Sequence, residues 1–135
     1  MATAPSTTLS ATSVMPSLTV NDVRQSLAFF EGLGFEVEER WEEKGALLGV
    51  MLKACQVRIG LSQDDGKKGR ERVKGLGFRL YLEVTGSIDD LAARATAAGI
   101  PLTKPPYDSE WGSRLFDVTE PSGFVLTITS PAKPA

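Results

Sequence analysis

The chain has no histidine among its 135 residues. This absence excludes every imidazole-ligated metal centre, every histidine general base and every Ser-His or Cys-His nucleophilic pair. The single cysteine, Cys55, excludes a disulfide within the chain and is typical of a reducing compartment. It falls at a predicted hairpin turn, and no neighbouring base in the sequence would activate its thiol, so we interpret it as inert.

Long apolar runs and an excess of one charge are also missing. No apolar stretch approaches the ~20 residues that a membrane-spanning helix requires. Fifteen basic and 17 acidic residues give a net charge of −2, which lacks the positive field of non-specific nucleic-acid binding. Residues 1–14 have neither the basic nor the apolar region of a signal peptide. We therefore expect a cytoplasmic protein that binds neither membranes nor nucleic acids.

The overall composition of the chain is sufficient for one folded domain. Hydrophobic residues make up 41% and charged residues 24% of the chain, at a length typical of a single core. We predict one domain over 15–130, a disordered tail at 1–14 that is rich in serine and threonine, and a second short tail at 131–135.

The domain shows the same order of local patterns twice. In the first half, alternation predicts a strand at 15–20, helical spacing predicts a helix that ends at Gly34, and three further strands follow. The second half repeats this order around a helix that is stopped by Gly99. The predicted fold class is therefore α+β, built from two β-α-β-β-β modules.

The modules are predicted at 15–62 and 77–130. The segment between them, 63–76, carries mixed charges and almost no apolar residues, so it is interpreted as a solvated linker. Two such modules can form a curved mixed sheet with helices on the outside and a cup on the inside, where a small molecule would bind. Alternation places one apolar set under the helices: Leu18, Val20, Leu80, Leu82, Val84, Leu126 and Ile128.

The opposite faces of these strands carry mixed, polar residues, as a binding surface would. A merely solvated sheet face is the alternative. Met15, Ser17, Arg79, Tyr81, Glu83 and Thr127 belong to this inner set, and alternation adds Arg58.

Three stretches of the sequence resemble one known family. They are Leu18 to Phe30 followed by Gly32-Leu-Gly-Phe35, then Leu80 to Val84 with Ile88 to Leu91, and Trp111-Gly-Ser-Arg-Leu-Phe116 leading into Glu120-Pro-Ser-Gly123. In order and spacing they resemble the vicinal oxygen chelate superfamily of glyoxalases, bleomycin-resistance proteins and extradiol dioxygenases. The resemblance covers 15–130, and the third stretch is similar to the bleomycin-resistance-like branch.

The metal-dependent members of that family hold an ion with two histidines and a glutamate. The resemblance places these ligands at Met15, Arg79 and Thr127 in this chain. A thioether, a guanidinium and a hydroxyl make a poor set for a divalent cation. We therefore expect no metal and no other cofactor.

What the resemblance then implies is a homodimeric protein that binds a small molecule without transforming it. Trp41, Tyr81 and Trp111 offer stacking surfaces. Packing is the alternative for Trp41, and plugging the cup or packing on a dimer mate is the alternative for Trp111. If Arg79 is unpaired it favours an anionic or carbonyl-rich ligand, whereas a pair with Glu83 or Asp117 satisfies its charge.

Two functions follow from this reading. The first is a small-molecule binding protein, with antibiotic sequestration as one form of it. The alternative is a divergent enzyme, namely a lyase, isomerase or dioxygenase, in which Glu83, Asp117 and Tyr81 supply acid–base groups.

Overall fold

The computed structural model describes residues 7–69 and 72–133. The two predicted tails therefore lie partly outside the described residues, at 1–6 and 134–135. The rest of the first tail, 7–14, is exposed and has no regular secondary structure. No helix in the described part of the chain is long and apolar enough to cross a membrane.

Module one contains one helix and a four-stranded sheet. Its strands lie in the order β1-β4-β3-β2, with β1 parallel to β4 and the other pairs antiparallel. Its elements are β1 (Ser17–Val20), α1 (Val23–Leu33), β2 (Glu36–Glu43), β3 (Ala46–Ala54) and β4 (Val57–Gln63).

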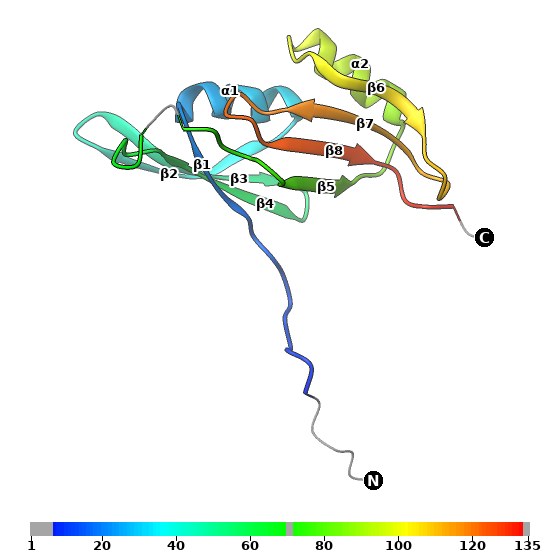
Figure 1. Cartoon of the computed structure of the whole chain (residues 1–135), viewed down its shortest axis with the longest axis horizontal. Helices are drawn as coiled ribbons and strands as arrows, with labels where there is room; N and C mark the ends of the chain where they lie inside the picture. The colour runs from blue at the N-terminus through cyan, green and yellow to red at the C-terminus, as the bar shows by residue number, and fades with distance from the viewer. Residues whose placement is uncertain (1–6, 70–71, 134–135) are drawn as a thin grey trace.

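Module two repeats this arrangement. Its strand order is β5-β8-β7-β6, again with one parallel pair between the first and last strands of the module. Its elements are β5 (Arg79–Glu83), α2 (Ile88–Ala97), β6 (Leu102–Asp108), β7 (Arg114–Thr119) and β8 (Val125–Thr129). The predicted pair of β-α-β-β-β modules and the α+β class are confirmed. Each module has its own sheet, and the described residues form no continuous sheet across both (Figure 1).

Both helices start and end where their sequences direct. The Asp22 carboxylate accepts hydrogen bonds from the backbone N–H groups of Arg24 and Gln25, which caps α1. Gly34 ends α1 in the left-handed conformation, with φ at 108°, which costs glycine little. The Ser87 hydroxyl caps α2 by accepting from the backbone of Asp90.

The two modules share one hydrophobic core. The cluster contains Val20 from β1, Phe30 from α1 and Ala95 from α2, together with Val118 and Leu126 from the second sheet. Of the apolar set predicted under the helices, Leu18, Val20, Leu126 and Ile128 are buried, while Leu80, Leu82 and Val84 pack half-buried against the same core.

Because the helix-covered faces meet in this core, the opposite faces of both sheets are directed away from it. Large apolar side chains are exposed there: Met15 is 47% exposed, Trp41 44% and Tyr81 63%. We call these the inner faces of the two modules, after their predicted position in a cup. Within this one chain they remain open.

The linker is more firmly anchored than its composition indicates. Asp64 and Lys74, at its two ends, are only 2% and 9% exposed. The Lys74 ammonium lies 2.9 Å from the Asp64 carboxylate, and Arg72 forms a second ion pair with the same carboxylate. The prediction of a fully solvated linker is therefore wrong at these two residues. The intervening stretch 65–69 is mostly exposed, as expected.

A second group of polar contacts joins module one to module two. The Ser26 hydroxyl on α1 donates to the Glu120 carboxylate in the β7–β8 turn, and both residues are at most 1% exposed. Beside them, the backbone N–H of Asn21 donates to the Ser122 hydroxyl at 2.8 Å. The backbone of Ser122 also donates to Glu120, at 2.6 Å. These contacts fix the start of α1 against the second sheet.

The Ser26–Glu120 contact should contribute measurably to stability. Ser26→Ala leaves the buried Glu120 carboxylate with one donor fewer, which costs about 1–3 kcal/mol of the free energy of unfolding. Urea denaturation measures this loss, and Ser62→Ala, at an exposed serine on β4, serves as the matched control. Equal stability of the two variants would show that the contact does not hold the modules together.

The linker ion pairs should make stability depend on acid pH. The backbone N–H of Gly66, the Lys74 ammonium and the Arg72 guanidinium lower the pKa of Asp64 from 3.8 to about 2. Because the folded pKa is depressed, this stabilisation is complete above about pH 4 and is lost as the pH falls towards 2. Asp64→Asn should therefore lower the melting temperature at neutral pH, and the gap from the parent should narrow below pH 4. Asp65→Asn, at the exposed neighbour, should show no such narrowing.

Candidate functional site

The inner face of module two carries a chain of three polar side chains from three neighbouring strands. Arg79 Nη1 on β5 donates to Thr127 Oγ1 on β8 at 2.6 Å and to Asp117 Oδ2 on β7 at 3.2 Å. Thr127 Oγ1 in turn donates to Asp117 Oδ1 at 2.7 Å. The strand register explains the meeting, because Thr127 pairs with Asp117 on one side and with Tyr81 on the other.

This arrangement decides between the two expectations for Arg79. The guanidinium is paired with Asp117, and Glu83 is not its partner. The Asp117 carboxylate is buried and the Arg79 side chain is 42% exposed, so the buried charge is compensated from the open side of the sheet. Both contacts use Nη1, which leaves Nε and Nη2 able to donate to the carbonyl oxygens of a ligand.

Tyr81 completes this face of module two. Its ring centroid lies 6.0 Å from the Arg79 guanidinium carbon, at the limit of a cation–π contact. Two residues further along β5, Glu83 is exposed at the end of the strand, and no hydrogen bond or ion pair in the described part of the chain joins it to Arg79, Thr127 or Asp117. Tyr81 is thus a free stacking surface beside a donor group.

The inner face of module one carries Trp41 and two glycines, Gly49 and Gly60. Trp41 on β2 lies over Gly49 of β3, where an added methyl group would come within 3.3 Å of its ring. At Gly60 on β4, the nearest neighbours of such a methyl group would be Ser17 Oγ at 3.7 Å and Met51 Cε at 3.9 Å. Gly60, Ser17 and Met51 thus lie close together on this face, and Met15 lies exposed just ahead of β1.

Arg58 and Trp111 lie outside these two groups. Arg58 forms a two-pronged ion pair with Glu38, at 2.9 and 3.1 Å, which lowers the pKa of the glutamate. Trp111 lies in the turn between β6 and β7, which a hydrogen bond from Ser109 N to Ser113 O closes, and it is 60% exposed. No contact in the described part of the chain connects either residue to Arg79.

Sequence reasoning missed the role of Arg114. Its guanidinium donates to Asp89 at 2.8 and 2.9 Å and to Asp108 at 3.1 Å, and these carboxylates raise its pKa. Asp89 stands in the first turn of α2, so Arg114 ties that helix to the β6–β7 hairpin. The only sequence signal was an arginine in the Trp-Gly-Ser-Arg run, which names no partner.

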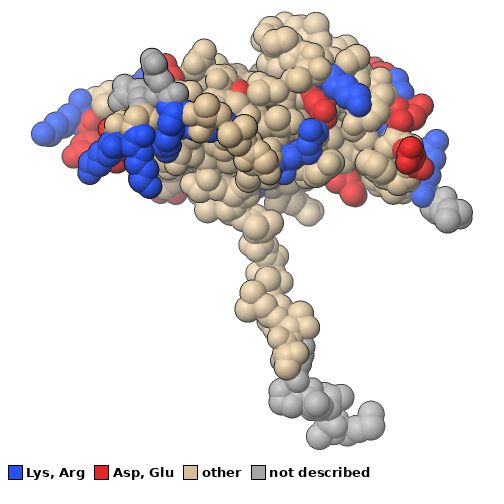
Figure 2. Space-filling view, in the orientation of Figure 1, with Lys and Arg blue, Asp and Glu red and all other residues tan. Residues whose placement is uncertain are grey.

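On one face of the molecule, the charged side chains are concentrated towards its two ends. In the face seen in Figure 2, basic and acidic side chains gather at the module-one end and again at the opposite end, and the middle is largely uncharged.

The residues at the inferred metal-ligand positions do not suit a divalent cation. Arg79 would direct a permanent positive charge at the ion, and its partner Asp117 is already engaged. Met15 belongs to the other module, and Thr127 Oγ1 is a neutral hydroxyl that donates to Asp117. The described residues contain no cluster of three or more histidine, cysteine, aspartate or glutamate side chains that could hold a metal.

The chain is similar to known proteins both in sequence and in fold. Residues 11–128 match the model of the Glyoxalase/Bleomycin resistance protein/Dioxygenase superfamily, and the chain belongs to this superfamily. A search of curated proteins found no match.

Several solved structures share the fold at low sequence identity. TioX from Micromonospora sp. ML1 is 19% identical, with a TM-score of 0.73 over 89% of this chain and 98% of that one. A glyoxalase/bleomycin resistance protein/dioxygenase from Nocardioides is 18% identical, with a TM-score of 0.69 over 96% and 89%. A bleomycin-binding protein complexed with bleomycin is 18% identical, with a TM-score of 0.66 over 90% and 99%.

Thr127 should be the residue that holds the polar chain on module two together. Thr127→Val keeps the shape but removes the hydroxyl that bridges Arg79 and Asp117, which costs about 1–3 kcal/mol of stability. Chemical denaturation measures the effect, and Thr19→Val, at an exposed position on β1, is the matched control. A Thr127→Val protein as stable as the control would contradict the bridging role.

Proposed function

We propose that this protein binds a small, flat, carbonyl-bearing molecule on its inner faces and sequesters it without transforming it. The observation that carries the proposal is the Arg79–Thr127–Asp117 chain. It sets a paired, 42% exposed guanidinium at one of the positions where the family resemblance implies a metal ligand, with Nε and Nη2 still able to donate. Such a group can hold a carbonyl, while Tyr81 beside it can stack on an aromatic ring.

The binding pocket in this proposal needs a second copy of the chain. The inner faces of both modules are open, and they expose Met15, Trp41 and Tyr81. Exposed apolar patches of this kind mark interaction surfaces. In a homodimer, module one of one chain would face module two of the other, which would bring the face around Gly60 opposite Arg79 and make two cups.

The ligand class follows from the residues on the two faces. Aromatic and thioether side chains favour planar or aromatic groups, and Arg79 favours carbonyl oxygens. Because Asp117 neutralises Arg79, the site does not demand an anion. The structural likeness to a bleomycin-binding protein complexed with bleomycin supports a glycopeptide antibiotic as a test ligand and membership of the bleomycin-resistance-like branch.

The dimer and the ligand are tested in turn. Sedimentation equilibrium should give a mass of twice the 14.5 kDa chain. Titration of that dimer with bleomycin and a panel of aromatic antibiotics should quench the fluorescence of Trp41 at micromolar concentrations or below. Tyr81→Ala, at an exposed residue, should weaken binding about tenfold because one stacking contact is lost. Arg24→Gln, on the exposed side of α1, is the control.

Two results would overturn the proposal. A monomeric mass at micromolar concentration would leave the cups unassembled. A protein that turns a ligand over, or holds one equivalent of a transition metal when purified without chelator, would instead support a divergent enzyme.

A further inference from the structure

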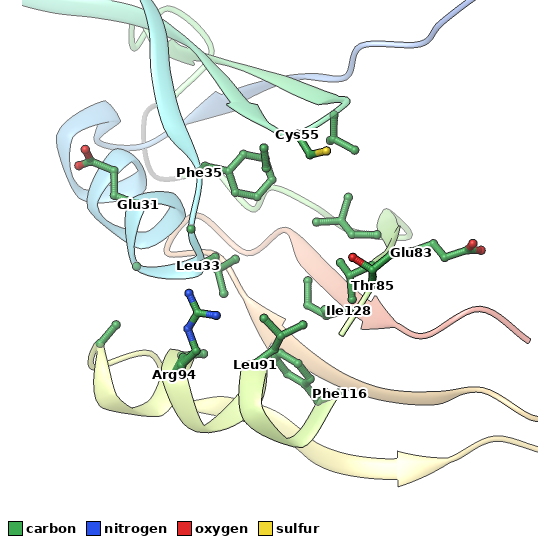
Figure 3. Close-up of a pocket in the computed structure, with 18 of the residues that line it drawn as sticks. Glu31, Leu33, Phe35, Cys55, Glu83, Thr85, Leu91, Arg94, Phe116 and Ile128 are labelled. Carbon is green, nitrogen blue, oxygen red and sulfur yellow. The ribbon is translucent and has the colours of Figure 1, made fainter. Parts of the chain in front are cut away.

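A crevice of about 990 Å³ lies between the two modules, on the helix side of the second sheet. Its floor is formed by Phe116 of β7 and Ile128 of β8, which are 1% and 6% exposed. One wall is formed by Leu33, the last residue of α1, and by Phe35, just after the Gly34 cap. Leu91 of α2 forms another wall (Figure 3). The lone cysteine, Cys55, stands at the rim in the β3–β4 turn.

This crevice is separate from the inner faces. Side chains alternate between the two faces along β7 and β8. Asp117 and Thr127 therefore lie on the inner face, in the polar chain of module two, while Phe116 and Ile128 face the crevice. Its size falls at the upper end of the range for small-molecule sites. The proposed function makes no use of it.

The crevice contains one inward cation. The guanidinium of Arg94 rises from α2 into the space beside Leu33, whereas the carboxylates of Glu31 and Glu83 are directed outward (Figure 3). No ion pair or side-chain hydrogen bond in the described part of the chain engages Arg94. An unpaired guanidinium next to apolar walls attracts an anion whose remaining part is apolar.

We propose that the crevice binds a carboxylate with an apolar tail, such as a medium-chain fatty acid. The carboxylate accepts hydrogen bonds from Arg94, and the tail lies over Phe116 and Ile128 between the end of α1 and Leu91. Burial of the tail supplies most of the affinity, and Arg94 selects the acid over a neutral or cationic analogue.

Dodecanoate and two analogues with the same tail, dodecyltrimethylammonium and dodecanol, test this selection. Dodecanoate should displace the fluorescent anion 8-anilinonaphthalene-1-sulfonate from the protein, and the two analogues should do so at least tenfold more weakly. Arg94→Gln should weaken dodecanoate binding about tenfold. Arg24→Gln, the same change at an exposed arginine near the other end of α1, should leave it unchanged.

Cys55 reports where the ligand lies, because it is the only cysteine of the chain and is exposed at the crevice rim. Saturating dodecanoate should slow the reaction of its thiol with a disulfide reagent in the parent but not in Arg94→Gln at the same concentration. Tyr81→Ala should leave both readouts unchanged, which separates this site from the inner faces.

The inference is overturned if Arg94→Gln and Arg24→Gln bind dodecanoate equally, or if Cys55 reacts equally fast with and without it. It is also overturned if Tyr81→Ala abolishes dodecanoate binding, since the acid would then occupy the inner face. The first two results do not bear on the dimer or on antibiotic binding, whereas the third would place the acid in the inner-face site of the proposed function.

Discussion

The hydrophobic core that the two modules share determines which faces of the sheets are buried and which stay exposed. Because the helix-covered faces of both sheets contribute to one core, the inner faces are directed away from it and stay open within one chain. Sharing the core gains apolar burial for both modules. The consequence is that Met15, Trp41 and Tyr81 are left in solvent. Assembly with another copy would bury these surfaces and would build the pocket at the same time.

Apolar burial has no direction, so it does not by itself fix how the two modules are oriented. That is the role of the buried polar contacts, in which a lost partner is costly. Ser26 on α1 meets Glu120 in the β7–β8 turn, and Lys74 meets Asp64 where the linker leaves and enters the sheets. Both sets lie at the N-terminal end of α1, and no hydrogen bond or ion pair in the described part of the chain joins its C-terminal end to module two. The crevice opens at that C-terminal end.

The sequence was sufficient to predict what depends on neighbours along the chain. Period-two alternation assigned Leu126 to the core and Thr127 to the opposite face, and capping chemistry placed the helix ends at Asp22 and Gly34. It could not predict contacts that depend on how the modules pack. Ser26 and Glu120 are 94 positions apart, and no local pattern pairs them. The crevice was missed for the same reason, because its walls come from both modules.

In the candidate site, too, local patterns predict which face a residue lies on, but not which residues it contacts. Alternation brought Arg79, Tyr81 and Thr127 to one face and left both Glu83 and Asp117 as possible partners of Arg79. The register of β5, β8 and β7 places Asp117 within reach of its guanidinium. That register has a second effect. Phe116 and Ile128 adjoin Asp117 and Thr127 in the chain and point to the opposite side. The two sites are therefore separated by one sheet thickness, and a slip of one residue in β8 would exchange their linings. The polar chain on one side thus holds the register that shapes the apolar floor on the other.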